Sequence, residues 1–109
     1  MNNEKSPETT NIYHGYDESN KHLRAMDGRN YFSQAGQDLF VLSMLSGKKG
    51  GNYIEIGGAD PFESNNTFLL EKDYSWKGFS VEFDETLASR FNSNRQNPCV
   101  CSDATTFNY

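Results

Sequence analysis

The chain has 109 residues, of which 35% are hydrophobic and 14% aromatic, and its mean hydropathy is −0.81. This length fits one ordinary domain, and the composition predicts an ordered, aromatic-rich part joined to a polar segment. The formal net charge is −5 and the sequence contains no dense cluster of Lys and Arg, which excludes nucleic acid and anionic membranes as expected partners, because phosphate neutralisation requires clustered cations.

Localisation is predicted from the N-terminus, the apolar runs and the cysteines. Residues 1–7 have no apolar core that could act as a signal peptide, and no apolar run approaches the ~20 residues of a membrane span. Cys99 and Cys101 are two residues apart, so a disulfide between them would be strained, and two thiols do not make a zinc site. We therefore expect a cytoplasmic protein with reduced cysteines and no metal.

The polar segment occupies residues 1–30, which are rich in Asn, Glu, Ser, Thr, Asp and Lys and show no sustained apolar period. This pattern predicts a flexible N-terminal extension. His14 and His22 lie in it and are interpreted as solvated surface residues rather than metal ligands. Order is expected to begin near Tyr31, so that residues 31–109 form the folded domain.

Helical and strand patterns alternate through the rest of the chain. Apolar residues at helical spacing predict helices, with Asp84 as a carboxylate N-cap of the last one, and short β-prone runs predict strands. The expected order is a helix with a wide apolar face over 37–45, a strand over 52–57, a helix over 64–72, a turn over 76–78, a strand over 79–83, a helix over 84–91 and a strand over 99–101. Strands separated by helices favour an α/β fold with a parallel sheet.

Three candidate site points follow the three predicted strands, at the sheet edge where parallel sheets bind ligands. The first is the sequence EIGGAD at 55–60, whose glycines permit a sharp turn and the close approach of a ligand. The second is Glu82, a carboxylate that can accept both hydroxyl hydrogens of a ribose. The third is Asp103, which could accept a hydrogen from an exocyclic amine such as that of adenine.

The residues around the glycines favour S-adenosylmethionine over a dinucleotide. A pyrophosphate is bound by a GxGxxG turn at a helix N-terminus, and the sequence GGADPF at 57–62 lacks the second and third glycines at that spacing. Asp60 and Glu63 would also repel a pyrophosphate. S-adenosylmethionine has no phosphate and carries a positive sulfonium, so an acidic glycine loop suits it better.

Several short motifs, taken in order, resemble the opening of FkbM-type methyltransferases. They are SQAGQD at 33–38, YIEIGGAD at 53–60, SNNT at 64–67, LE at 70–71, WKG at 76–78, VE at 81–82 and RF at 90–91. The resemblance covers about residues 31–109. It implies part of a class I methyltransferase (Rossmann-like) fold, namely its first three strands with flanking helices. It also implies S-adenosylmethionine as methyl donor and an oxygen atom of a small molecule or sugar as acceptor.

The strand-end positions and this resemblance together give the predicted cofactor-binding residues. They are Glu55, Gly57, Gly58, Ala59, Asp60, Asn66, Thr67, Glu82, Phe83, Asp103 and Ala104. The resemblance places Glu82 on the ribose, Asp103 and Ala104 beside the adenine, and Gln34, Gln37 and Asp38 near the cofactor mouth. Asn65, Asn66 and Thr67 also fit plain capping and turn roles, and Trp76 fits packing better than substrate contact.

Departures from the family pattern and the length of the chain shape the functional prediction. Pro61 stands where these proteins often have a further glycine, and Asn65 and Asn66 occupy the place of a single Asn. Because the fold normally has seven strands, we interpret residues 31–109 as the N-terminal half of a truncated domain, with a sheet edge available for self-association. No general base is evident. Two alternatives stay open: a non-catalytic remnant or interaction module, and a nucleotide-dependent oxidoreductase.

Overall fold

The computed structural model describes Tyr13, Leu23–Arg24 and residues 30–109, so His14 and His22 lie outside the described residues. Its elements, in chain order, are β1 (Leu23–Arg24), β2 (Asn30–Tyr31), α2 (Gln37–Met44), β3 (Asn52–Ile56), α3 (Phe68–Tyr74), β4 (Lys77–Glu82), α4 (Glu85–Asn94) and β5 (Cys99–Cys101). Among these helices, none has the length and apolar character needed to cross a membrane.

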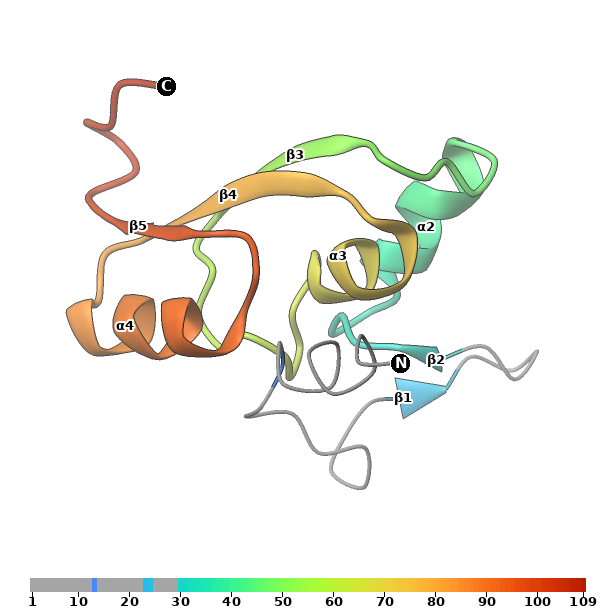
Figure 1. Cartoon of the computed structure of the whole chain (residues 1–109), viewed down its shortest axis with the longest axis horizontal. Helices are drawn as coiled ribbons and strands as arrows, with labels where there is room; N and C mark the ends of the chain where they lie inside the picture. The colour runs from blue at the N-terminus through green and yellow to red at the C-terminus, as the bar shows by residue number, and fades with distance from the viewer. Residues whose placement is uncertain (1–12, 14–22, 25–29) are drawn as a thin grey trace, which may run out of the picture.

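The strands β3, β4 and β5 form a parallel sheet in that order, which confirms the predicted α/β arrangement. In the register, Glu55 pairs with Ser80 and Ile54 pairs with Phe79, so these two pairs face opposite sides of the sheet. The helices α3 and α4 both lie on one side of the sheet, as Figure 1 shows. Because the three strands are parallel, their carboxyl ends lie at the same edge of the sheet.

The sheet face opposite these helices is only partly covered. Ile54 and Ile56 on β3 are 53% and 58% exposed. Farther along this face, Phe107 from the C-terminal segment packs against Phe79 with ring centroids 5.8 Å apart, and Tyr109 packs on Phe107. In Figure 1 the C-terminal segment rises from the end of β5 on the side away from α4.

Several predicted element boundaries were wrong. The helix α4 ends at Asn94 instead of 91 and α3 ends at Tyr74 instead of 72, and the starts of β4 and α3 also differ. The strand β4 begins at Lys77 instead of 79, because the Lys77 amide donates to the Gly51 carbonyl and Gly78 pairs with Tyr53. The helix α3 begins at Phe68 instead of 64. Ser64 has a φ of 55°, a left-handed conformation that a right-handed helix cannot include. The residues between the glycine turn and α3 therefore form a loop.

The helix α2 buries less of its apolar surface than its sequence pattern predicts. Leu42 is 3% exposed, but Phe40 and Met44 are 65% and 66% exposed. Asp38, in the first turn, is fully buried and accepts hydrogens from the Phe32 amide (2.9 Å) and the Ser33 hydroxyl (2.6 Å). This carboxylate thus fixes the segment that enters the helix.

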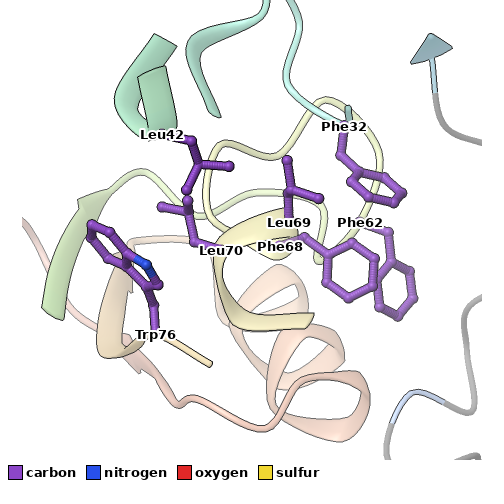
Figure 2. Packing of buried hydrophobic residues seen from close by; sticks show 7 residues of the cluster. All are labelled: Phe32, Leu42, Phe62, Phe68, Leu69, Leu70 and Trp76. Carbon is purple, nitrogen blue, oxygen red and sulfur yellow. The ribbon is translucent and has the colours of Figure 1, made fainter. Parts of the chain in front are cut away.

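The main hydrophobic cluster lies between α2, α3 and the loop before α3 (Figure 2). Its members are Phe32, Leu42, Phe62, Phe68, Leu69, Leu70 and Trp76. The Phe68 ring packs edge-on against Phe32 and Phe62, at 4.8 Å between centroids in each case. Trp76 is 5% exposed and its Nε1 donates to the Lys48 carbonyl at 2.8 Å, which confirms its predicted packing role. A smaller cluster under β5 contains Ala88, Phe91 and Cys99.

Part of the polar N-terminal segment contributes to the described structure. Residues of β1 and β2 form a short antiparallel ladder that the sequence pattern did not predict, with Leu23 opposite Tyr31 and Arg24 opposite Asn30. Tyr13 packs edge-on against Phe68, with ring centroids 5.2 Å apart.

Candidate functional site

The three points predicted at the strand ends come together at one edge of the sheet. The Ala59 amide, in the turn after β3, donates to Glu82 Oε1 at the end of β4, at 2.9 Å. The Ser102 amide, just after β5, donates to the Glu82 carbonyl at 3.1 Å. Glu82 is therefore the central residue of this edge, and Asp103 follows directly on its other side. We call this the strand-end edge.

The Glu82 carboxylate holds two backbone segments at once. Its Oε1 accepts from the Ala59 amide, and its Oε2 accepts from the Asp84 amide at 2.9 Å. The residue is half-buried. A carboxylate offers about four lone-pair positions, so two amides leave capacity for two further donors.

The glycine turn owes its shape to two different properties of glycine. Gly57 has a φ of 78°, and a Cβ there would meet no atom within 4 Å, so glycine is favoured for its backbone conformation. Gly58 is not in this region. A Cβ on it would lie 3.1 Å from Ser80 Cβ and 3.2 Å from Phe91 Cε2. The sequence argument assigned both glycines to a sharp turn and to close approach of a ligand. The φ of Gly57 agrees with the sharp turn, but at Gly58 the reason is close packing on Ser80 and on Phe91 of α4.

Ala59 completes the turn in a left-handed conformation, with a φ of 53°. Such a conformation is uncommon for a residue with a Cβ and is held here by its hydrogen bond to Glu82. The exposed surface of the turn therefore comes from Gly57 and Ala59, while Gly58 faces the protein interior.

Asp60 stabilises the loop that follows the turn. Its Oδ1 accepts from the amides of Phe62 (2.8 Å) and Glu63 (2.7 Å), and its Oδ2 accepts from Arg90 Nη1 on α4 (2.8 Å). Partial desolvation acts to raise the pKa of Asp60, but these amides and the guanidinium outweigh it and lower the pKa below its ordinary value. Pro61 and Phe62 are buried, so they do not obstruct the turn.

Glu55 and Thr67 lie beneath the turn, on the side that faces the helices. Glu55 Oε1 accepts from the hydroxyls of Ser80 (2.7 Å) and Thr67 (2.9 Å). Burial raises the pKa of Glu55 even though both hydroxyls favour its charged form. The structure thus divides the predicted residues in two. Glu55, Gly58 and Thr67 are buried, whereas Gly57, Ala59, Asp60, Asn66, Glu82, Phe83, Asp103 and Ala104 are exposed or half-buried.

On the far side of Glu82, Phe83 and Asp103 are both exposed. Phe83 is 76% exposed, the largest value among the exposed apolar side chains given for the described residues. Asp103 Oδ1 accepts from the amide and hydroxyl of Thr105 at 2.9 and 2.7 Å, and these hydrogen bonds lower the pKa of Asp103. Among the described residues, no donor occupies Asp103 Oδ2.

A buried charged pair that the sequence analysis missed lies behind the loop. Arg95 Nε donates to Glu71 Oε1 at 2.8 Å, and the two side chains are 0% and 1% exposed. Arg95 Nη1 donates to the Pro61 carbonyl at 2.7 Å. Its guanidinium lies 4.6 Å from the centre of the Phe91 ring and 5.3 Å from that of Phe68. Nothing in the sequence indicated this pair, because no local pattern marks a buried arginine.

The predicted cofactor-binding residues also omitted Asn65. Its Oδ1 accepts from the amides of Thr67, the N-cap residue of α3, and of Phe68, the first residue of the helix, both at 2.8 Å. Its Nδ2 donates to the carbonyls of Gly58 (3.2 Å) and Asp60 (2.9 Å). Asn65 thus has the turn role considered for this segment, because it satisfies the amides at the start of α3 and also contacts the carbonyls of the glycine turn.

The segment predicted near the cofactor mouth, residues 34–38, follows Ser33, which pairs with the loop after the glycine turn. Gln34 and Gln37 are exposed, whereas Asp38 is fully buried. Ser33 forms an isolated parallel bridge with Ser64, which places this segment beside the loop that follows the glycine turn. The contacts of Asp38 are with its own segment, so its side chain does not face the strand-end edge.

Among the described residues, the other surface features point to no competing site. An open hollow on α4 is lined by Glu85, Thr86, Ser89 and Arg90, all from one helix, and it differs from the strand-end edge. Across the described ranges, no group of three or more His, Cys, Asp or Glu side chains could hold a metal ion.

Comparison with protein-family models, curated proteins and solved structures found no match. The strand-end residues themselves therefore supply the evidence for a function.

Proposed function

We propose that the strand-end edge binds the adenosine part of S-adenosylmethionine, and that the chain is the cofactor-binding portion of an FkbM-type methyltransferase. The observation that carries this proposal is the 2.9 Å hydrogen bond from the Ala59 amide to Glu82 Oε1. It joins a glycine turn after one parallel strand to an acidic side chain at the end of the next. That juxtaposition is what a ribose bound across a sheet edge requires.

Glu82 is suited to the ribose because its carboxylate is already oriented. The Ala59 and Asp84 amides fix the two oxygens, so that no side-chain freedom is lost when a ligand binds. The remaining lone pairs can accept from two neighbouring hydroxyls, which is the arrangement of a ribose. If Glu82 served only to hold the two backbone amides, its remaining lone pairs would have no role.

Phe83 and Asp103 flank Glu82 and supply the chemistry that an adenine needs. The Phe83 ring is 76% exposed and offers a flat apolar surface on which a purine can stack. Asp103 is exposed at the end of the adjacent strand, and its Oδ2 is available to accept a hydrogen from an exocyclic amine. A sugar and a base can therefore be recognised side by side.

A dinucleotide fits this edge less well than S-adenosylmethionine does. A pyrophosphate binds where a helix begins directly after the glycine turn, but here a loop separates Gly57 from the start of α3 at Phe68. The carboxylates of Asp60 and Glu82 would repel phosphate oxygens, whereas they attract the positive sulfonium and ammonium groups of S-adenosylmethionine. This contrast argues against a nucleotide-dependent oxidoreductase.

Methyl transfer itself demands little covalent chemistry from the protein. The methyl group passes to the acceptor in a direct displacement, so the residues of the chain bind and orient the donor. We propose an oxygen atom of a small molecule or sugar as the acceptor.

A non-catalytic interaction module is the competing function. It is favoured by the fact that both oxygens of Glu82 and one oxygen of Asp103 already accept hydrogens from nearby backbone groups. In that case these acids would serve only to hold the strand-end loops, and the edge would bind no nucleoside.

Isothermal titration with S-adenosylhomocysteine separates these functions. We expect the chain to bind it, Glu82→Ala to weaken binding at least about tenfold, and NADH to bind no better than background. Asp73→Ala is the matched control, because Asp73 is an exposed acid at the end of α3, next to the opposite edge of the sheet. The absence of measurable binding at millimolar ligand, or equal affinity of the Glu82→Ala and wild-type chains, would reject the proposed function.

A further inference from the structure

We propose that Arg95 is the positioning residue of the strand-end edge and that it acts on the glycine turn through Asn65. The inference rests on the proposed function for its ligand, but the contact chain it invokes lies entirely within the protein. Arg95 itself is buried behind the loop and does not reach the strand-end edge, so any effect on binding must be transmitted.

The guanidinium of Arg95 is immobilised. It forms a buried ion pair with Glu71, and its plane lies near the rings of Phe91 and Phe68. Glu71 is fixed in turn, because its Oε2 accepts from the Gln96 amide at 2.8 Å. A charge buried in this way persists only when its hydrogen bonds are satisfied, so its donors hold a defined geometry.

The outer nitrogens of Arg95 contact the loop before α3 at three oxygens. Nη1 donates to the Pro61 carbonyl (2.7 Å) and to Asn65 Oδ1 (3.2 Å), and Nη2 donates to Thr67 Oγ1 (3.1 Å). These acceptors lie about 30 positions from Arg95 in the sequence, with separations of 34, 30 and 28 residues. The loop is thus shaped from outside by one side chain.

Asn65 passes this constraint to the turn. Its Oδ1 accepts from Arg95 Nη1 at 3.2 Å as well as from the Thr67 and Phe68 amides at 2.8 Å. With Oδ1 held in this way, Nδ2 faces the carbonyls of Gly58 and Asp60. These two residues flank Ala59, whose amide is the one that meets Glu82. Arg95, acting together with the Thr67 and Phe68 amides, therefore helps to set the position of the Ala59 amide relative to the Glu82 carboxylate.

A lysine cannot replace this arginine. Both carry a positive charge and can pair with Glu71, but only the planar, forked guanidinium can donate to three separated acceptors while it stacks on aromatic rings. Arg95→Lys thus keeps the positive charge and removes the forked arrangement of N–H donors. A second variant, Asn65→Asp, keeps the Oδ1 acceptor but replaces the Nδ2 donor with an oxygen. It therefore loses the hydrogen bonds to the Gly58 and Asp60 carbonyls while Arg95 is unchanged.

The first measurement needs no ligand. Amide hydrogen exchange by NMR at low temperature reports the protection of the Ala59 amide, with the Ala88 amide inside α4 as an internal reference. We expect Arg95→Lys and Asn65→Asp to accelerate exchange at Ala59 at least about tenfold relative to Ala88. Leu42→Ala truncates a core residue that Figure 2 shows on the far side of the hydrophobic cluster from Phe62, the cluster's loop residue, and should leave this ratio unchanged.

The second measurement is the affinity for S-adenosylhomocysteine under conditions where every variant is folded by circular dichroism. We expect Arg95→Lys and Asn65→Asp to bind at least about tenfold more weakly than wild type, and Leu42→Ala to bind equally well. Wild-type affinity together with unchanged Ala59 protection in Asn65→Asp overturns the proposal. Equal losses in Leu42→Ala would also overturn it. A wild-type chain that binds no ligand rejects the proposed function, while the exchange ratio still decides the role of Arg95.

Discussion

Replacing Gly58 by alanine tests whether this glycine exists for packing. The new Cβ would lie 3.1 Å from Ser80 Cβ and 3.2 Å from Phe91 Cε2, closer than carbon atoms normally approach. Phe91 and Ser80 are both 0% exposed, so neither can move toward solvent. Overpacking of this kind destabilises a core by about 1–3 kcal/mol, and we expect Gly58→Ala to fall in that range.

Urea unfolding of wild type and variants measures this effect, with a double-mutant cycle to identify its cause. Phe91→Leu removes the ring atoms that the new methyl group meets, so the penalty of Gly58→Ala should shrink by about 1 kcal/mol or more in that background. Gly57→Ala is the contrast, because a Cβ there meets nothing within 4 Å and only the φ of 78° opposes it. Additive effects of Gly58→Ala and Phe91→Leu, or a change below about 0.5 kcal/mol for Gly58→Ala alone, would refute the packing explanation.

Three further predictions concern stability, pH and thiol reactivity. Asp38→Ala should lower the free energy of unfolding in urea by about 3 kcal/mol, because it leaves several buried donors without their acceptor; a loss below about 1 kcal/mol would contradict this. Burial raises the pKa of Tyr53 above its ordinary value of 10, so the fold favours the neutral phenol, and the contribution of Tyr53 to stability should be constant below pH 10 and be lost above it. Urea titrations at alkaline pH should show a shallower fall for Tyr53→Phe, although Tyr13, whose pKa is also raised, keeps the slope from vanishing. A thiol reagent should modify the exposed Cys101 rapidly and the buried Cys99, whose pKa burial raises to about 11, only on unfolding; equal rates would contradict the structure.

Much of the fold could be predicted from the sequence because its signals are local. The Asp84 carboxylate accepts from the Leu87 amide at 2.9 Å and caps α4 as predicted, since a cap and its helix lie within one turn of chain. The alternation of β-prone runs with capped apolar segments likewise indicated a parallel sheet. Because parallel strands end at a common edge, the positions of Glu82 and Asp103 in the sequence were enough to predict that they would lie together.

The boundaries and the exposed faces were less predictable. The start of α3 at Phe68 depends on the left-handed conformation of Ser64 and on the side chain of Asn65, which the apolar pattern does not record. The exposed apolar side of α2, with Phe40 and Met44, has the same composition as a buried one. Periodicity shows which residues share a face, but it does not show whether another element covers that face.

The sequence by itself therefore determined the order of the helices and strands after residue 36, the parallel sheet and the three site points at its strand ends, because the helix, strand and cap signals lie within a few positions of chain. Only the tertiary structure decided which of the predicted site residues reach the surface and which support it from below. Gly58 packs on a helix, Glu55 lies under the turn, and Arg95 contacts a loop 34 positions earlier in the chain. These roles depend on contacts between segments that are distant in the sequence. The residues next to a given position do not show which distant residue it will contact in the folded protein.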